Sequence, residues 1–323
     1  MNILVTGGLG LIGHNVVLRL QNLGHNVIIT DMQTDYGIIP DDELKYLMGE
    51  RLKKIDYPDF YNYDVSSEIC MSALFNEHQF DIVIHMASFP RQKVVNVDPA
   101  VGSRVMSEGL INLLELSKKT SVKKFVYISS SMVYGDFTDD VTEDAICNPQ
   151  GQYGIMKLAG EWLVKDYTRR GCFDHTIIRP SAVYGPLDVE DRVVAKFMLT
   201  AMRGGELRVN GAKETLDFTY VDDAADGIVA AALSENTKNK TYNITKSHSR
   251  TLYDAAILAT DIVGKGSIEV RGKDADFPSR GALNIDAAKR DFGYDPKVDV
   301  EEGFQKYYEW LSNSPFWSKK TAQ

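Results

Sequence analysis

The sequence of 323 residues is poor in cysteine and in long apolar runs. Its three cysteines, Cys70, Cys147 and Cys172, are odd in number and widely spaced, which argues against a disulfide framework and against a metal site built on cysteine. No apolar stretch approaches the about 18 residues that a membrane helix needs, so we expect no membrane association. The chain enters a strand pattern at once, without a signal peptide, and a cytoplasmic protein is therefore expected.

Positive charge is also scarce. Lysine and arginine total 36 against 45 acidic residues, the formal net charge is −9, and no basic run is longer than a pair. Nucleic acids and anionic membranes bind clustered positive charge, so neither is an expected partner, and we expect a small-molecule substrate instead. The apolar fraction of 44% is enough for a sizeable core, either in one large domain or in a core domain with a smaller lobe.

What the sequence does contain, at its start, is a glycine-rich turn between a strand pattern and a helix pattern. Residues 2–5 form an apolar run typical of a buried parallel strand, and residues 11–23 place apolar side chains on one helical face. Gly7, Gly10 and Gly13 in the turn fit G-x-x-G-x-x-G, and the overlapping pattern G-x-G-x-x-G fits as well. This arrangement is typical of a dinucleotide-binding site.

The physical reason is the pyrophosphate of the dinucleotide. It approaches the first turn of a helix, where backbone N–H groups lack partners and the dipole is positive, and a Cβ there would hold the phosphates away. A second apolar strand, residues 26–30, ends on Asp31. Its carboxylate can accept hydrogen bonds from the adenosine ribose and would repel a 2′-phosphate, which favours NAD over NADP.

Further along the chain, strand and helix patterns alternate. We expect helices at about 42–52, 66–77, 99–119 and 152–170, and strands at 61–65, 81–87, 124–129 and 175–179. The alternation predicts an α/β fold with a doubly wound parallel sheet, which binds its ligands at the carboxyl ends of the strands.

The alternation loosens after about residue 181. We therefore predict an NAD-binding domain over residues 1–180, to which residues 215–245 return, and a mainly substrate-binding lobe over residues 181–323. The polar segment 32–61 is predicted to be an insertion near the adenosine end of the cofactor, and the tail 312–323 is predicted to be frayed.

A second decisive pattern is Tyr153 followed four residues later by Lys157, one turn apart on the same helical face. A free tyrosine, with a pKa of about 10, is a poor base, but a nearby ammonium and the positive nicotinamide ring favour the phenolate. Tyr153 could then remove the proton of a substrate hydroxyl while hydride leaves the same carbon. Lys157 would also hold the nicotinamide ribose, and Ser130 or Ser131 would hold the substrate oxygen.

Taken together, these patterns resemble the extended short-chain dehydrogenase/reductase family, in its NAD-dependent epimerase/dehydratase branch, over nearly the full length. The matching segments are 6–13, Asp31, 64–65, 85–87, 129–135, 153–157, 179–186, 217–223 and 292–296. The resemblance implies a Rossmann-type sheet with a smaller C-terminal α/β lobe. It also implies a homodimer, formed through the helices expected at 100–119 and 152–170.

The resemblance also assigns roles to single positions. It implies that Ser130 is the catalytic hydroxyl, Tyr153 the base and Lys157 its helper. The residues implied in cofactor binding are Gly7, Gly10, Leu11, Ile12, Gly13, Asp31, Asp64, Val65, Met86, Ala87, Ser88, Ser129, Tyr153, Lys157, Pro180 and Val183. Substrate contacts are expected from Ser131, Met132, Arg192 and Arg280, and no metal is expected.

Departures from the family pattern narrow the chemistry. Dehydratases of the family carry Asp-Glu after the catalytic hydroxyl, where this chain has Ser131 and Met132, so 4,6-dehydration is not expected. Members that act on sugar nucleotides have an Asn at the position of Ala182 and an Arg at the position of Leu216, both for the diphosphate. If the diphosphate is bound here, other cations, such as Arg192 or Arg280, must replace them.

Three hypotheses remain. The leading one is an NAD-dependent epimerase or dehydrogenase acting on a nucleotide-activated sugar. The alternative is an NAD-dependent dehydrogenase or reductase of a non-nucleotide alcohol or sugar. A non-catalytic NAD-binding sensor is a minor alternative, because such a protein is expected to have lost Tyr153 or Lys157, and both are present.

Overall fold

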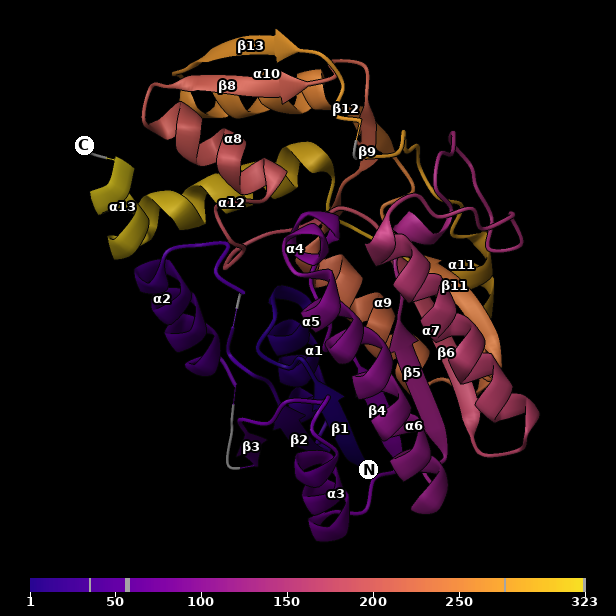
Figure 1. The fold of residues 1–323 in the computed structure, drawn as a ribbon. Coiled ribbons are helices and arrows are strands. Elements are labelled where there is room, and N and C mark those ends of the chain that lie inside the picture. Colours follow the sequence, from indigo (N-terminus) through magenta and orange to yellow (C-terminus); the bar gives the residue numbers. More distant parts are fainter. Residues whose placement is uncertain (35, 56–58, 276, 322–323) are drawn as a thin grey trace.

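The computed structural model describes residues 1–34, 36–55, 59–275 and 277–321. A parallel sheet forms its centre (Figure 1). The strands of this sheet are β1 (Asn2–Thr6), β2 (Asn26–Thr30), β3 (Phe60–Tyr61), β4 (Ile82–His85), β5 (Lys124–Ile128), β6 (Asp174–Pro180) and β11 (Lys240–Ile244). They lie in the order β11-β6-β5-β4-β1-β2-β3, and every neighbouring pair is parallel. This confirms the predicted fold class.

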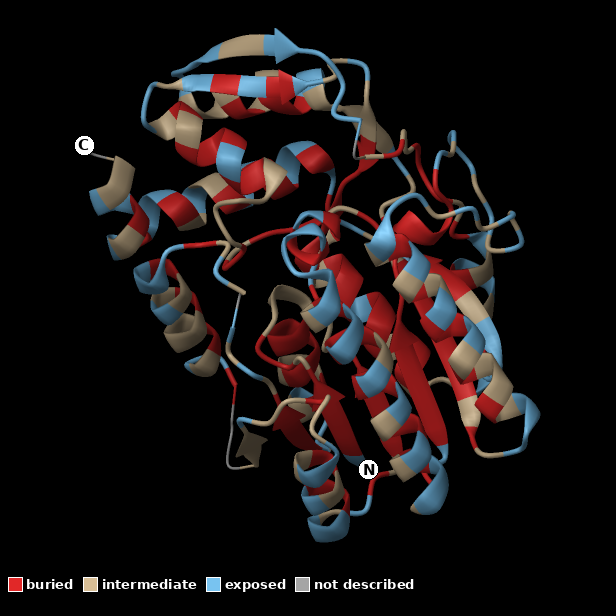
Figure 2. Ribbon diagram, in the orientation of Figure 1, coloured by how far each residue is buried: buried red, intermediate tan, exposed pale blue. Residues whose placement is uncertain are grey.

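Helices cover both faces of the sheet. One face carries α1 (Leu11–Asn22), α9 (Val221–Leu233) and α11 (Asp286–Phe292), and the other carries α3 (Glu68–Glu77), α4 (Gln92–Val97), α6 (Gly109–Lys119) and α7 (Gln152–Arg169). Alternate residues of a strand point to opposite faces. Accordingly, Ile3 and Val5 pack under the first group of helices and Leu4 packs under the second. Figure 2 shows the buried strands between helices whose outer faces are exposed.

The helix expected at 99–119 is built in three parts. It consists of α5 (Pro99–Ser103), a π-helical turn (Arg104–Glu108) and α6. Asp98 caps its first turn by accepting a hydrogen bond from the Val101 N–H at 3.0 Å.

The smaller lobe lies beyond the carboxyl ends of the strands (Figure 1). Its apolar core is enclosed by the helices α8 (Val193–Met202), α10 (Leu252–Val263), α12 (Val300–Asn313) and α13 (Pro315–Thr321). Its paired strands are β8 (Glu206–Asn210) with β13 (Ser267–Arg271), β9 (Thr215–Asp217) with β12 (Ser249–Thr251), and β7 (Val183–Tyr184) with β10 (Thr219–Tyr220).

Two predictions about elements were wrong. The third strand is shorter than 61–65, because Tyr63 donates its N–H back to the Tyr61 carbonyl at 3.0 Å and the chain leaves the sheet. The tail is not frayed over its described part, since α13 buries Trp317 completely. The insertion contains α2 (Asp41–Leu52), which packs under α12 and α13. The ring of Tyr46 in α2 stacks on the ring of Phe316 in α13, with 4.5 Å between the ring centres.

Within the described ranges, no helix is both long and apolar enough to cross a membrane. Over the same residues, no group of three or more histidine, cysteine, aspartate or glutamate side chains could hold a metal ion. The three cysteines are free thiols.

Candidate active site

The glycine turn after β1 is shaped as a cradle that side chains would fill. Gly7 has a φ of +69°, its N–H donates to the Thr30 carbonyl at 2.8 Å, and a Cβ on it would lie 2.6 Å from the Ala87 nitrogen. A Cβ on Gly13 would lie 2.1 Å from the Gly7 carbonyl oxygen. No side chain caps the start of α1 at Gly10, so its first N–H groups remain directed at the turn. These features fit a pyrophosphate.

Asp31 lies at the carboxyl end of β2, beside this turn. One carboxylate oxygen accepts a hydrogen bond from the Leu9 N–H at 2.9 Å, and the other accepts one from the Gln33 N–H at 2.7 Å. Burial raises the pKa of this carboxyl group, and the two backbone N–H groups oppose the shift. Each oxygen keeps a lone pair for a ribose hydroxyl, so the residue fits the adenosine side of NAD.

Several other predicted cofactor residues surround the same turn. Leu11 and Ile12 pack with Val183 in one apolar cluster at the start of α1. Met86 and Ala87 follow β4, and their N–H groups donate to the Thr6 carbonyl at 3.1 Å and to the Thr6 hydroxyl at 3.2 Å. The structure therefore brings the residues predicted for the pyrophosphate and its surroundings together.

The remaining predicted cofactor residues form hydrogen bonds or packing contacts with other residues of the protein. Asp64 accepts a hydrogen bond from the Ser66 N–H at 2.8 Å, the Ser88 hydroxyl donates to the Phe89 carbonyl at 2.9 Å, and the Ser129 hydroxyl donates to Glu161 at 2.6 Å. Val65 is buried against Gly109, and Pro180 ends β6 in register with Ile244 of β11. The side chain of Ser129 in particular is turned into the protein.

The three predicted catalytic residues lie together at the carboxyl end of β5. Ser130 lies close enough to Tyr153 to lower the pKa of its phenol, and the Ser130 hydroxyl accepts the Met132 N–H at 3.2 Å. Lys157 donates from its Nζ to the Ile128 carbonyl at 2.8 Å, and the same Nζ lies 5.8 Å from the centre of the Tyr153 ring. Such a constellation can exchange a proton with a hydroxyl or carbonyl placed beside Tyr153 and Ser130.

Opposing effects act on the charges of this group. Burial raises the pKa of Tyr153, whereas the hydrogen bond from Ser130 and the positive charges of Arg192 and Arg280 lower it. Burial lowers the pKa of Lys157 to about 7, against the opposing charge of Glu161. The sequence predicted that a lysine lowers the pKa of the tyrosine; in the structure, the positive charges of Arg192 and Arg280 also lower it.

The two predicted substrate arginines differ in how firmly they are held. Arg192 donates to the Val183 carbonyl at 3.4 Å, and its Nε lies 3.9 Å from a carboxylate oxygen of Asp188. The Nε of Arg280 is buried and has no hydrogen-bond partner among the residues that the structure describes. Burial and the charge of Arg192 lower the pKa of Arg280 to about 10.

Ser131 and Met132, also predicted to contact the substrate, lie in a 3₁₀ turn and are 1% and 5% exposed. The Ser131 hydroxyl donates to the Ser181 hydroxyl at 3.1 Å. Ala182, at the position where the family has an asparagine, has a φ of +34°, a region that residues other than glycine rarely adopt.

Two supporting residues were missed by the sequence analysis. Gln92 accepts the Tyr153 N–H at 3.0 Å and so fixes the start of α7. Glu161 accepts hydrogen bonds from Ser129 and from Arg179, the latter at 2.9 and 2.6 Å to its two oxygens, and ties α7 to β5 and β6. The spacing of Glu161, four residues after Lys157 on the same helical face, could have indicated it. For Gln92 no local signal exists.

Comparisons with known proteins agree with this geometry. The model of a family described as the NAD dependent epimerase/dehydratase family matches residues 3–245. An uncharacterised UDP-glucose epimerase of Bacillus subtilis is 28% identical, with 97% of this chain and 98% of that protein covered.

Two solved structures are similar over almost their whole length. A UDP-glucose 4-epimerase of Thermotoga maritima with UDP-glucose has a TM-score of 0.85 at 28% identity, covering 100% of both chains. A UDP-glucuronic acid 4-epimerase of Bacillus cereus, in complex with UDP-glucuronic acid and NAD, has a TM-score of 0.88 at 27% identity, covering 96% of this chain and 98% of the other.

Proposed function

The chain belongs to the NAD-dependent epimerase/dehydratase family, and from this premise we propose that it is an epimerase that acts on a nucleotide-activated sugar. The observation that carries the proposal is that Ser130 and Lys157 both lie beside Tyr153, with the Lys157 Nζ one turn along α7 and 5.8 Å from the centre of the Tyr153 ring. This group stands at the same edge of the sheet as the glycine turn, which fits the cofactor of the family.

NAD would be held by the glycine turn at its pyrophosphate, by Asp31 at the adenosine ribose and by Lys157 at the nicotinamide ribose. When bound, it supplies the reversible hydride acceptor that oxidation of a sugar carbon requires. We infer that residues 1–180 form the NAD-binding domain, to which α9 and β11 of the segment 215–245 return, and that most of 181–323, with β9 and β10, forms the substrate lobe. The pairing of β11 with β6 and the packing of α9 against α1 support this division.

The chain's own residues would perform the proton transfers. Tyr153, as the phenolate, takes the proton of the substrate hydroxyl, and Ser130 orients that hydroxyl by hydrogen bonding. The positive charges of Arg192 and Arg280 favour the phenolate before the reaction. When the ketone is reduced on its other face, Tyr153 returns the proton, so the enzyme ends in its starting protonation state.

The two residues after the catalytic hydroxyl favour epimerisation over dehydration. Elimination of water from the sugar needs an acid and a base beside the ring. The two positions after Ser130 are Ser131, which is hydrogen-bonded to Ser181, and Met132, which cannot transfer a proton.

The substrate class rests on the relatives and on local charge. The three similar proteins described above are named as UDP-sugar epimerases, and two of them are solved with UDP-sugars. With Ala182 and Leu216 at the positions of the family's diphosphate-binding side chains, we infer that Arg192 and Arg280 bind the diphosphate. The buried, unpartnered Nε of Arg280, within the described residues, supports this role.

The test is to purify the protein, release any bound NAD or NADH by denaturation, and assay the native protein with UDP-glucose and UDP-glucuronic acid. We expect about one NAD per chain and interconversion of epimers without net NADH. Net accumulation of NADH would favour the dehydrogenase alternative instead. A protein that contains no NAD and converts no sugar nucleotide when NAD is added would contradict the proposal.

A further inference from the structure

A buried arginine of the insertion joins the cofactor turn to the substrate lobe. Arg51, at the end of α2, is 3% exposed. One nitrogen of its guanidinium group donates to the Leu9 carbonyl at 2.8 Å, and another donates to the Leu187 carbonyl at 2.6 Å. Leu9 lies in the glycine turn, and Leu187 lies in the segment that leads from β7 to α8. A single side chain thus bridges two loops that are far apart in the sequence.

On the cofactor side, Arg51 and Asp31 together hydrogen-bond both backbone groups of Leu9 in the turn. The N–H of Leu9 donates to Asp31 at 2.9 Å, and the carbonyl of Leu9 accepts from Arg51. The Leu9 side chain is completely buried, so this residue cannot rotate without losing its packing as well. The backbone of the turn that receives the pyrophosphate is therefore set by Asp31 and Arg51 together.

On the substrate side, the segment 187–190 is fastened to the insertion by contacts of three kinds. Besides the bond from Arg51, the Leu187 side chain packs in an apolar cluster with Ile39 and Leu47. The Glu190 N–H donates to the buried carboxylate of Glu43 at 2.7 Å. Leu187 itself has a φ of +70°, an unfavourable backbone conformation that these contacts must hold in place.

The same segment leads to the catalytic tyrosine. Asp188, next to Leu187, is 3% exposed and lies 3.9 Å from Arg192, one of the two arginines that face Tyr153. The titratable groups whose charges interact with Arg51 include Asp188 of the substrate segment, Asp31 after β2, Tyr307 of α12, Glu43 of α2 and His14 of α1. Arg51 is thus the buried cation between the acidic group at the ribose site and the acidic group beside Arg192.

We propose that Arg51 is a positioning residue that couples the NAD site to the substrate site. One planar guanidinium group holds the pyrophosphate turn and the segment before Arg192 in a fixed relation, so ordering of one site by its ligand prepares the other. This inference rests on the proposed function, because it requires NAD and a nucleotide ligand. Lysine cannot replace the arginine, since its single ammonium lacks the forked geometry that reaches both carbonyls.

The test measures how UDP affects the release of NAD from the purified protein with its bound NAD. The rate of NAD loss is followed with and without saturating UDP in the wild type, Arg51→Met and Arg51→Lys. The control is Arg169→Met, because Arg169 is exposed on α7 and pairs with Asp166. Thermal unfolding of each variant shows whether it is folded, and Arg51→Lys keeps the buried charge should Arg51→Met fail to fold.

We expect UDP to slow NAD release at least about fivefold in the wild type and in Arg169→Met. In both Arg51 variants the ratio of the two rates should fall toward one. A wild type without this effect, or Arg51 variants that keep it in full, would overturn the coupling while leaving the proposed function intact. A wild-type protein that binds no NAD would overturn both.

Discussion

At the scale of single residues, the pKa of Tyr153 decides the pH at which this residue could act as the proposed base. The phenol is buried, which raises its pKa, while Ser130, Arg192 and Arg280 act in the opposite direction. A base must be deprotonated to act, so activity rises with pH through its pKa. In the proposed mechanism, two arginines that lie far away in the sequence therefore favour the deprotonated form of Tyr153.

This balance predicts the effect of Arg280→Met on the pH dependence of the reaction. Removing a positive charge that faces the phenol raises the pKa of Tyr153, so the acidic limb of the kcat/KM profile should move to higher pH. The measurement is the pH profile of the variant beside the wild type. Arg208→Met is the matched control, because Arg208 is exposed and pairs with Glu269 in the smaller lobe. A profile of Arg280→Met that coincides with the wild type would contradict the assignment.

Single residues also show what a sequence can and cannot reveal. The positions of Tyr153, Lys157 and Asp31 at the site were predictable because each belongs to a local pattern of helix spacing, glycine turn or strand end, whereas that pattern left Ser130 and Ser131 as alternatives that the family resemblance decided. Arg51 was not, because its two carbonyl partners are separated from it by 42 and 136 residues. Contacts of that kind depend on the packing of whole elements.

At the scale of elements, buried strands and amphipathic helices were predicted well because their apolar patterns are local. The predicted segments 26–30 and 124–129 correspond to β2 and to β5, which ends at Ile128. The third strand was predicted too long, because the turn that ends it depends on the Tyr63 N–H bonding back to Tyr61. The apolar residues 315–317 of the tail did not by themselves indicate that α13 would pack against α2, where Phe316 stacks on Tyr46.

The buried tail predicts that Trp317→Ala is strongly destabilising. Trp317 is 0% exposed in the core of the small lobe, and removal of a buried large aromatic side chain typically costs about 3–5 kcal/mol. Urea unfolding of the wild type and the variant measures the difference. Lys319→Ala, in the same helix, is the control and should change stability by less than about 0.5 kcal/mol. A loss below about 1 kcal/mol for Trp317→Ala, well under the range for a buried aromatic, would mean that the tail is frayed after all.

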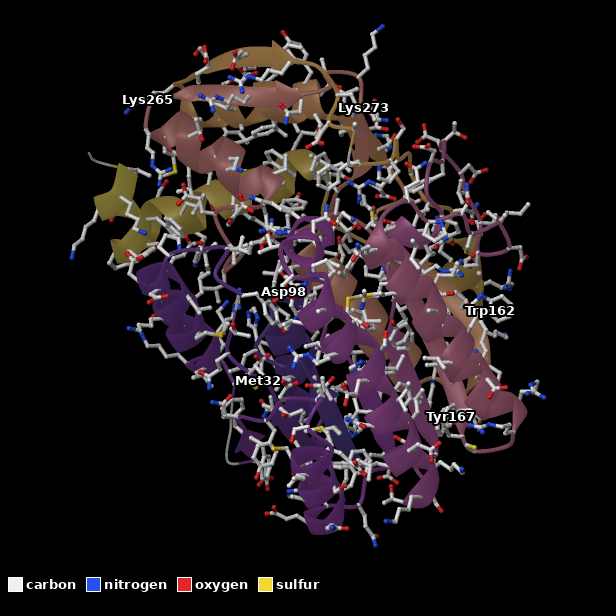
Figure 3. The ribbon with its side chains drawn as sticks, in the orientation of Figure 1. Met32, Asp98, Trp162, Tyr167, Lys265 and Lys273 are labelled. Carbon is white, nitrogen blue, oxygen red and sulfur yellow. The ribbon has the colours of Figure 1, made fainter. Side chains whose placement is uncertain are left out.

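At the scale of the whole molecule, the outer faces of α6 and α7 are the surfaces on which the homodimer implied by the family resemblance would form. Exposed apolar side chains lie on these helices, with Ile111 at 41%, Ile155 at 53% and Trp162 at 66% exposure. Figure 3 labels Trp162 on α7. Exposed apolar groups of this size favour an interface with a second copy of the chain.

Trp162→Glu is therefore expected to weaken or abolish the dimer, because it places a charge in an apolar interface. Sedimentation velocity at several concentrations compares it with the wild type, and Tyr253→Glu supplies a control on the exposed surface of the other lobe. A wild type that sediments as a monomer at all concentrations would contradict the dimer.

The whole chain is thus organised by the meeting of two sites at one edge of the sheet: the glycine turn with Asp31, and Tyr153 with Ser130 and Lys157. The glycine turn could be predicted from the first residues, and the catalytic helix from a single spacing. The way in which the insertion ties the glycine turn to the segment 187–190 is visible only in the folded structure, since α2 contacts both of these segments.

The central claim is that conversion of the sugar needs the phenol hydroxyl of Tyr153, whereas binding of NAD does not need that hydroxyl. The most direct measurement determines bound NAD and the rate of epimer formation from a UDP-sugar in the wild type and in Tyr153→Phe. We expect Tyr153→Phe to retain NAD at the wild-type level and to lose about 10²–10⁴-fold in kcat, because the proton acceptor is gone. Turnover by Tyr153→Phe at the wild-type rate would contradict the role of Tyr153 as the base.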